Sequence, residues 1–458
     1  MLSSSAKKLF QEYGIDDIPK GCVYFKDAVD YILSMDLTFR AESVSIDTKR
    51  WRGAFLRFYQ RQCIQDSIVD DKLQSGIIVV PCGGGKTHIG CSLSTLVNGL
   101  VLILTITTKS AIQWYNTISS MDSTKCITCI ISGSESKDVS KADIIITTYG
   151  MFLENNHMIS VTKVRRKDLI IADESHRVVA KNISKQILKT HKKCIIGFTA
   201  TNIREDDEMK HLPNIIGPQL SNVPLSLLVE HKFISNVKCK TIHVLDLPNT
   251  SLLTKDLTHT QKVQVSVLNK NKIHIFFNEL RKLLSDNKKV IVLNDDISTL
   301  HILHNYIKVS FEFEPIGPID MSSNNKQRTI AENQFRGSVE SMSNNVLLAG
   351  RALDEAWDAN ADAIIQLCTS WGSRRQYQQR IGRVQRPSQR NNFEAESITI
   401  STLFEEKYVE HRDKYLESEG YSVTQEYYNT QFGSENDLLE IIDVVKNLNK
   451  RKRKKDEK

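Results

Sequence analysis

The sequence predicts an α/β fold of two tandem domains, each built on a parallel sheet. Short apolar runs rich in β-branched residues alternate with helix-compatible stretches. Runs without polar alternation are typical of parallel strands covered on both faces, and their βαβα rhythm is typical of doubly wound sheets. The rhythm stops near residue 238 and resumes near 288, which indicates a second domain. The expected strands are 76–80, 100–106, 142–147, 169–172 and 194–198 in the first domain, with runs starting at 288, 346 and 363 in the second.

Length and rhythm together divide the 458 residues into five parts. A domain usually has about 100–200 residues, so two domains with flanking segments are expected. Between them lies a polar stretch with helical character in its second half, which we interpret as a linker or a small insertion. The expected parts are an N-terminal segment (1–50), a first domain (51–238), the linker or insertion (239–287), a second domain (288–425) and a helical, basic C-terminal tail (426–458).

The charge distribution excludes a protein that coats a polyanion along its whole surface. The chain has 61 basic and 54 acidic residues, a net charge of +7. Residues 450–458 alone contain seven basic and two acidic side chains, so the rest is nearly neutral. A nucleic-acid site must therefore be a local groove. The tail itself is interpreted as a nuclear-localisation signal, a DNA-affinity extension or a solvating end.

The sequence predicts an intracellular protein without a membrane partner. Its first residues lack the apolar core of about 7–15 residues that a signal peptide requires. No apolar run approaches the roughly 18 residues of a membrane span. The nine cysteines have no disulfide rhythm, which favours reduced thiols. Cys126 and Cys129 form a C-x-x-C pair without the second pair of a zinc site, and we expect a strand there.

The strongest motif is a glycine-rich loop that follows the strand 76–80 and precedes a helical stretch. Glycines let backbone N–H groups surround phosphates, and the helix N-terminus adds a favourable dipole. We expect Lys86 to reach the β- and γ-phosphates of ATP and the Thr87 hydroxyl to hold Mg²⁺. Val80 replaces the first glycine of the strict pattern, and a plain glycine-rich turn is the alternative. The loop consists of Pro81, Cys82, Gly83, Gly84, Gly85, Lys86 and Thr87.

Two carboxylates directly follow the strand 169–172. The carboxyl end of a strand is where α/β sheets bind ligands. Asp173 is placed to hold Mg²⁺ through water, and Glu174 to polarise the attacking water as a general base. An Asp-Glu pair alone is common surface chemistry. After a phosphate loop, it predicts the acidic half of an ATPase site.

An arginine-rich motif lies in the second domain, in a helix expected to start after Ser373. Gln379, Arg383 and Arg386 stand at i, i+4 and i+7, on one face of that helix. Two arginines there could reach the γ-phosphate and neutralise transition-state charge, an effect worth about 10³–10⁵ in rate. The alternative is a solvated basic face.

In this order, these motifs resemble those of superfamily 2 helicases, and more closely those of the XPB-type branch, the DNA translocases of transcription and repair. The likeness covers roughly residues 50–425. The residues that carry it are Leu56–Gln60, Pro81–Thr87, Gln113–Trp114, Thr147–Tyr149, Asp173–His176, Thr199–Thr201, Arg204–Asp206 and Gln379–Arg386.

The resemblance implies two RecA-like domains, use of ATP and Mg²⁺, and 3′-to-5′ movement on duplex or single-stranded DNA with transcription or repair proteins as partners. It implies that Gln60 contacts adenine and that Thr199 and Thr201 couple hydrolysis to motion. Further residues assigned to coupling and nucleic acid are His176, Arg204, Glu205, Asp206, Asp354 and Gln379, of which Arg204–Asp206 resembles a segment that opens duplex DNA. The loops 105–109, 147–149 and 294–299 are expected to contact the phosphate backbone of one nucleic-acid strand.

The sequence also departs from the family pattern. Ser175 replaces a usual valine, and Leu353 replaces a usual glycine before Asp354. About 50 residues precede the first motif, and the thumb-like insertion, if it is 239–287, is short. These features predict a minimal member that is viral, archaeal-like or from a reduced genome, with a virion or cytoplasmic location if viral and a nuclear one if the tail is a localisation signal. An RNA-directed or restriction-type motor and a non-hydrolysing nucleotide clamp are the alternative functions.

Overall fold

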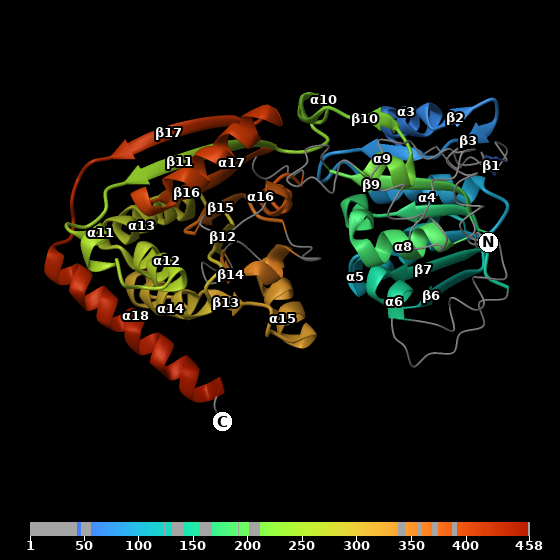
Figure 1. Ribbon diagram of the computed structural model, residues 1–458. Helices are drawn as coiled ribbons and strands as arrows, with labels where there is room; N and C mark the ends of the chain where they lie inside the picture. Colours follow the sequence, from blue (N-terminus) through green and yellow to red (C-terminus); the bar gives the residue numbers. More distant parts are fainter. Residues whose placement is uncertain are drawn as a thin grey trace, which may run out of the picture. The chain divides into compact units, whose positions relative to one another are not determined.

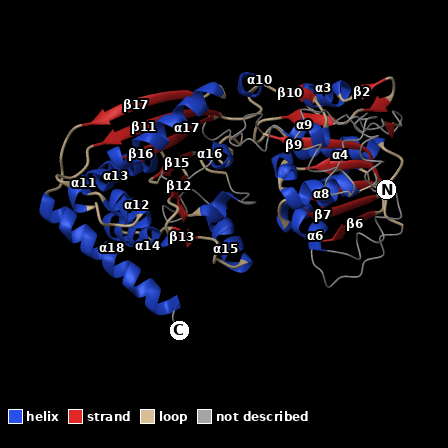
Figure 2. Cartoon of the chain, viewed as in Figure 1, coloured by secondary structure: helices blue, strands red, loops and turns tan. Residues whose placement is uncertain are grey.

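The computed structural model describes eleven stretches of the chain, which form two compact units that divide between Pro224 and Leu225. Each unit contains one large sheet flanked by helices (Figures 1 and 2). No described helix is long and apolar enough to cross a membrane. The described residues are 44–46, 56–122, 124–130, 141–154, 167–190, 192–200, 211–337, 345–354, 360–368, 374–386 and 392–456.

The described part of the first unit contains a sheet of seven parallel strands, which confirms the predicted α/β class. All five apolar runs expected from the sequence form strands. In sheet order the strands are β10 (Gln219–Asn222), β4 (Gly76–Val79), β9 (Lys192–Thr199), β8 (Lys167–Ala172), β5 (Val101–Thr105), β7 (Ile144–Thr148) and β6 (Ile127–Ile130). A small antiparallel sheet joins β1 (Val44–Ser45), β3 (Lys72–Leu73) and β2 (Ile68–Val69).

Helices cover both faces of this sheet, because its strands are apolar on both sides. β5 and β7 are buried along their whole length. Side chains on one face pack with α6, α8 and α9, whereas α4 and α5 pack on the other, where Gly90 lies against Trp114 and Phe198. The helices are α3 (Phe58–Asp66), α4 (Lys86–Leu96), α5 (Thr108–Met121), α6 (Tyr149–Glu154), the 3₁₀ helix η3 (Ser175–Val179), α8 (Lys181–Lys189) and α9 (Leu212–Ile216).

The second unit repeats this plan with another sheet of seven described parallel strands. In sheet order they are β13 (Ile316–Ile319), β14 (Val346–Ala349), β12 (Val290–Leu293), β15 (Ala363–Gln366), β16 (Glu394–Ser401), β11 (Asn236–Val244) and β17 (Ser422–Tyr428). Its helices are α10 (Leu225–Glu230), α11 (Thr250–Leu253), α12 (His259–Leu268), α13 (Lys270–Ser285), α14 (Ile297–Phe311), α15 (Asn325–Arg336), η6 (Arg351–Asp354), α16 (Arg374–Ile381), η8 (Leu403–Glu405), α17 (Glu406–Ser418) and α18 (Glu435–Asp456).

The structure differs from the sequence expectation in the stretch 239–287. Most of β11 lies there, inserted between β16 and β17, and α12 and α13 contribute to the core of the second unit. β11 was not recognised because polar residues such as Lys238 and Lys240 interrupt its apolar residues. The first unit accordingly ends at Pro224 rather than at 238.

The segment expected as a basic tail, 426–458, contains the end of β17 and then the helix α18, which packs on the second unit. α18 buries Leu438, Ile441, Ile442 and Val445 in a cluster with residues of α12. These four apolar residues recur at helical spacing, which explains why this helix has a buried face.

Candidate nucleotide-binding site

The loop between β4 and α4 has the backbone that phosphate binding requires. Gly83 and Gly85 adopt φ angles of 77° and 81°, a left-handed conformation that glycine accepts without strain. The Gly84 N–H donates to the Pro81 carbonyl at 3.1 Å, and α4 begins at Lys86. The first N–H groups of a helix have no intrahelical acceptor, so they are available to an anion.

Two side chains of α3 fix this loop from outside. The Tyr59 hydroxyl and the Gln60 amide both donate to the Gly84 carbonyl, at 2.6 and 3.1 Å. A Cβ added to Gly85 would lie 2.4 Å from Gln60 Nε2, so Gln60 packs directly on the loop. The role of Gln60 toward adenine stays a prediction. Tyr59 was not expected from the sequence, although it lies in the segment Leu56–Gln60 that carries the resemblance.

The acidic pair lies at the carboxyl end of β8, as the sequence predicts for ligand binding. The carboxylate of Asp173 accepts the Trp114 indole N–H at 3.0 Å and the Glu174 backbone N–H at 3.0 Å. Its backbone carbonyl accepts the Tyr149 hydroxyl at 2.8 Å. Glu174 has a φ of 49°, in the left-handed region that costs a non-glycine residue about 1–2 kcal/mol. Such strained backbone is typical of functional sites.

The structure brings the loop lysine and the acidic pair together within the first unit. Lys86 Nζ lies 3.2 Å from Glu174 Oε1, and the two side chains are 13% and 21% exposed. His176 Nδ1 lies 3.4 Å from the other Glu174 oxygen. Glu174 therefore lies between Lys86 and His176. A triphosphate bound by the loop would compete with Glu174 for Lys86.

Burial and neighbouring charges shift the pKa values of Asp173 and Lys86. Burial, reinforced by the neighbouring Glu174 charge, raises the pKa of Asp173 to about 6, although Lys86 and the Trp114 hydrogen bond oppose the shift. Burial is the largest single effect on Lys86 and would lower its pKa. The negative charges of Glu174, Cys82 and Asp173, with the Glu174 hydrogen bond, together outweigh burial and raise that pKa. Lys86 is thus a permanent cation, as phosphate binding requires.

The residues fit a magnesium–nucleotide complex. Mg²⁺ usually takes one or two protein ligands and completes its shell with phosphates and water. Thr87 on α4 and Asp173 after β8 are donors of that kind. Among the described residues, no group of three His, Cys, Asp or Glu side chains could hold a metal ion by itself. No disulfide joins the cysteines that the structure describes, Cys126 and Cys129 included.

The structure describes only part of the expected coupling segment. Thr199 ends β9, is buried, and accepts the Val80 N–H on its carbonyl at 3.0 Å. It therefore contacts the strand that leads into the phosphate loop. Thr201 and Arg204–Asp206 lie outside the described residues, as does the side chain of Asp354.

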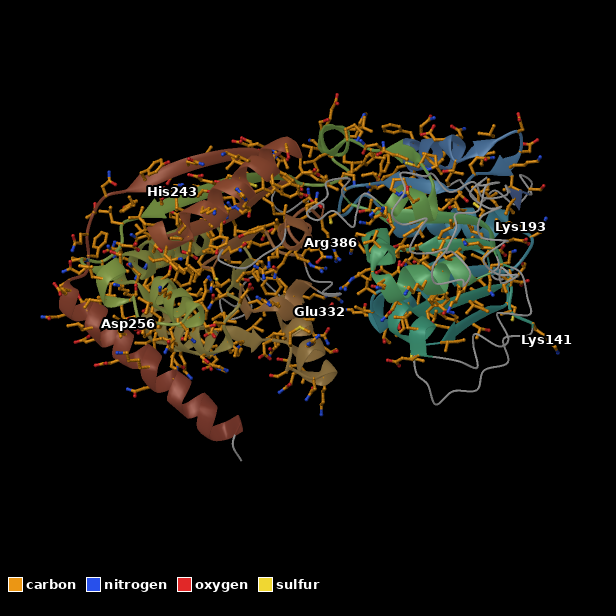
Figure 3. All side chains as sticks on the ribbon, in the orientation of Figure 1. Lys141, Lys193, His243, Asp256, Glu332 and Arg386 are labelled. Atoms are coloured by element: carbon orange, nitrogen blue, oxygen red, sulfur yellow. The ribbon has the colours of Figure 1, made fainter. Side chains whose placement is uncertain are left out.

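The arginine motif of the second unit does not form the expected single helical face. α16 ends at Ile381, and turns follow in which the Arg383 N–H donates to the Arg380 carbonyl at 3.0 Å. Gly382 directly follows the helix, and glycine is unfavourable in a helix interior. Gln379 thus lies on α16, whereas Arg383 and Arg386 lie beyond it and are both half-buried. Arg386 is labelled in Figure 3.

Arg380 of the same motif forms a contact that the sequence does not predict. It pairs with Asp295 at 2.5 Å, and both side chains are nearly inaccessible to solvent. Asp295 follows β12, so this pair ties α16 to the carboxyl end of the sheet. Arg380 lies inside the motif Gln379–Arg386, so the sequence does single out its segment. Its partner Asp295 is far away in sequence, and no local pattern predicts that pairing.

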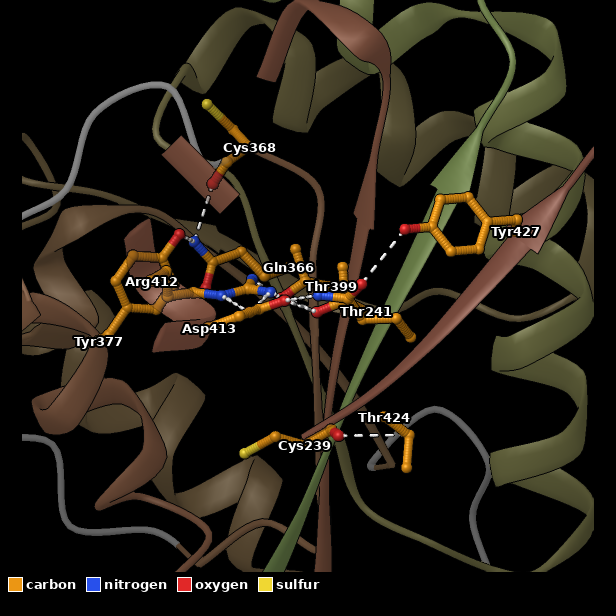
Figure 4. A network of polar contacts seen from close by, with 11 residues as sticks. Cys239, Thr241, Gln366, Cys368, Tyr377, Thr399, Arg412, Asp413, Thr424 and Tyr427 are labelled. Carbon is orange, nitrogen blue, oxygen red and sulfur yellow. Dashed lines mark hydrogen bonds and ion pairs between the residues drawn. The ribbon is translucent and has the colours of Figure 1, made fainter. Parts of the chain in front are cut away.

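A buried polar network behind α16 joins it to three strands (Figure 4). Arg412 of α17 donates to Thr241 of β11 at 2.5 Å and to Thr399 of β16. Its guanidinium lies 5.3 Å from the centre of the Tyr377 ring, and the Tyr377 hydroxyl accepts the Gln366 amide at 2.9 Å. The network holds the arginine motif against the sheet.

Comparison with known families agrees with this arrangement. Residues 54–204 match the family model "Type III restriction enzyme, res subunit", and residues 228–457 match "ERCC3/RAD25/XPB C-terminal helicase". The fold and the nucleotide site define the chain as a superfamily 2 helicase, an ATP-dependent enzyme class that acts on nucleic acid. Within that class the chain belongs to the ERCC3/RAD25/XPB helicase family, which confirms the predicted resemblance.

Curated relatives in this family are identical to the chain at about a quarter of the aligned positions. The XPB helicase/translocase subunit of general transcription and DNA repair factor IIH from Enterocytozoon bieneusi is 27% identical over 89% of this chain and 69% of its own length. The subunits of the same name from Dictyostelium discoideum and Drosophila melanogaster are 26% and 27% identical, over 94% and 89% of this chain. The chain spans 55% and 51% of these two proteins.

Solved structures show the same fold. Dbp5 of S. cerevisiae bound to RNA and ADP BeF3 has a TM-score of 0.54 at 16% identity, covering 85% of this chain and 92% of that chain. The type ISP restriction-modification enzyme LlaBIII bound to DNA has a TM-score of 0.58 at 15% identity, covering 85% and 32%. The shared architecture confirms two RecA-like α/β units.

Proposed function

We propose that this chain is an ATP-driven motor that moves on or opens duplex DNA in transcription or repair. The observation that carries the proposal is the placement of Lys86, Asp173 and Glu174 in one site of the first unit. The names of the relatives, helicase/translocase subunits of a transcription and DNA repair factor, support DNA as the substrate and transcription or repair as the process.

Hydrolysis follows from exchange at the Lys86–Glu174 pair. When the phosphates of ATP enter the loop, they take over the Lys86 ammonium and release Glu174. The freed carboxylate is then available to orient and deprotonate the attacking water, a role typically worth about 10²–10⁴ in rate. Thr87 and Asp173 would hold Mg²⁺, which supplies neutralisation of phosphate charge when bound.

The arginines of the second unit are proposed to complete the reaction. Arg383 and Arg386 lie on turns beyond α16 that the buried Arg380–Asp295 pair ties to the sheet. Guanidinium groups delivered to a γ-phosphate accelerate its transfer strongly. This assignment rests on the resemblance of Gln379–Arg386 to the helicase motif. It also rests on the Arg380–Asp295 pair, which holds the end of α16 where these turns begin.

Contacts with nucleic acid are proposed at the carboxyl ends of β5 and β7. Thr107 caps α5 by accepting the Ser110 N–H at 3.1 Å, and Thr108 and Lys109 are exposed beside it. Hydroxyls, amides and a lysine at a helix start are groups that bind a phosphate backbone without recognising its sequence. The proposed partners are therefore DNA and, by the names of the relatives, transcription or repair proteins, with the nucleus as the location in a nucleated cell.

One experiment tests the substrate. Phosphate release by the purified chain is measured alone and with equal nucleotide concentrations of duplex DNA, single-stranded DNA and RNA. We expect duplex DNA to stimulate turnover most. Stronger stimulation by RNA would replace the proposal with the RNA-directed alternative. Nucleotide binding without release under every condition would identify a clamp.

A further inference from the structure

Asp173 is held by side chains from two different helices. Trp114 of α5 donates its indole N–H to Oδ2 at 3.0 Å, and Tyr149, the first residue of α6, donates its hydroxyl to the backbone carbonyl at 2.8 Å. The remaining carboxylate oxygen accepts the Glu174 N–H at 3.0 Å. The position of this carboxylate therefore depends on where α5 and α6 lie.

The indole of Trp114 cannot adjust independently of its surroundings. Its side chain is completely buried, and its ring centre lies 6.5 Å from that of Phe198 on β9. A Cβ added to Gly90 of α4 would come within 2.3 Å of the indole, so α4 packs directly on the ring. Because interiors are close-packed, a shift of α5 moves the indole donor with it.

Both residues adjoin the loops that we expect to contact nucleic acid. The capped start of α5, with exposed Thr108 and Lys109, precedes Trp114 by less than two helical turns. Tyr149 itself ends the segment 147–149 and is buried with its hydroxyl on Asp173. A nucleic-acid strand bound at the start of α5 would be linked to the Asp173 carboxylate through Trp114. A strand bound at 147–149 would be linked to it through Tyr149.

We propose that Trp114 and Tyr149 are positioning residues that set the Asp173 carboxylate and transmit nucleic-acid occupancy at α5 and α6 to the nucleotide site. Neither residue is assigned a contact with the nucleotide. Trp114 acts on the Asp173 carboxylate directly, and Tyr149 acts through the backbone carbonyl of Asp173. The inference rests on the proposed function for its nucleic-acid part, whereas the positioning of Asp173 depends on the first unit alone.

The test uses the full chain and two matched pairs of variants. Trp114→Phe removes the N–H donor, and Phe198→Leu perturbs the same packing without removing a donor. Tyr149→Phe removes the hydroxyl, and Tyr115→Phe removes a hydroxyl from an exposed position on α5. Thermal melting first establishes that each variant is folded.

Two quantities are then measured. The first is the Mg²⁺ concentration for half-maximal binding of a fluorescent ADP analogue. The second is the ratio of duplex-stimulated to basal phosphate release.

Loss of one hydrogen bond predicts a change of about threefold to tenfold. We expect Trp114→Phe to raise the Mg²⁺ requirement by that factor, and Tyr149→Phe to lower the stimulation ratio by that factor. Phe198→Leu and Tyr115→Phe should leave both quantities within about twofold of wild type, as for changes that lose no hydrogen bond.

The proposal is overturned if Trp114→Phe and Phe198→Leu change the Mg²⁺ requirement equally, since packing alone would then explain it. An unchanged stimulation ratio in Tyr149→Phe overturns the transmission role. Wild-type protein that no nucleic acid stimulates refutes the proposed function and the transmission role together. In that case the Mg²⁺ requirement of Trp114→Phe still decides whether Asp173 is positioned as described.

Discussion

Replacing Glu174 by glutamine separates binding of the nucleotide from its hydrolysis. The substitution keeps the shape of the side chain but removes the negative charge that lies 3.2 Å from Lys86 Nζ. We expect ATP to bind at least as tightly as to the wild-type protein, while turnover falls by at least about 10²-fold through loss of a general base.

The size of the effect on binding follows from the ion pair. Two unit charges at this separation attract by about 1 kcal/mol in water and about 5 kcal/mol at an effective dielectric of about 20. Partial exposure of both side chains, 13% and 21%, places the pair nearer the lower value. The phosphates must displace Glu174 from Lys86, so its neutralisation should tighten ATP binding by up to about tenfold, equivalent to about 1.4 kcal/mol.

The assay combines titration of a fluorescent ATP analogue with single-turnover phosphate release. Lys86→Ala serves as the comparison, because it removes the cation instead of its competitor and should weaken binding. If Glu174→Gln weakened binding as strongly as Lys86→Ala, Glu174 would be a structural support of the loop. Turnover within a fewfold of wild type would refute the role of general base.

Three further predictions concern the second unit. Lys272 and Glu405 form an ion pair with both side chains fully buried, so Lys272→Met should lower the free energy of unfolding by about 3–5 kcal/mol, and adding Glu405→Leu should recover most of it in urea melts. An equal loss in the double variant would contradict this. Burial raises the pKa of Asp246 to about 6, so the folded chain binds an extra proton and loses stability as pH rises from about 4 to about 6. Asp246→Asn should remove that slope and stabilise the protein at pH 7.5 by roughly 1–3 kcal/mol, whereas an unchanged slope in calorimetry would assign it to another group. Arg383→Ala and Arg386→Ala should preserve ATP affinity and lower turnover non-additively, and small additive effects on turnover would instead indicate a solvated basic face.

Local patterns in the sequence were sufficient for most of the first unit. β4, β5, β7, β8 and β9 were predicted because strands covered on both faces need continuous apolar runs. The phosphate loop and the acidic pair were predictable for a related reason. Each is a short segment whose chemistry depends on its own residues and on the strand before it.

Contacts between distant segments could not be predicted in this way. β11 alternates apolar and charged residues because Lys238 pairs with Glu394, and Lys240 with Glu279 and Glu426. Those partners are far away in sequence, so the strand resembled a polar linker. The hydrogen bond from the Trp114 indole to Asp173 was also not predicted, because these two residues are far apart in sequence. The end of α16 at Ile381 was missed because the spacing of the arginines fits a continuous helix.

The position of β11 also constrains the order in which the chain can fold. The described strands of the first sheet are complete at Asn222, so that unit can assemble while later residues are still being synthesised. The first described strand of the second unit is β11, and its two neighbours, β16 and β17, are the last described strands along the chain. Such long-range pairing is slow because loop-closure entropy must be overcome before contacts form. Until β17, which ends at Tyr428, has left the ribosome, at least one edge of β11 stays unpaired, and this interval is when the second unit is most prone to aggregation.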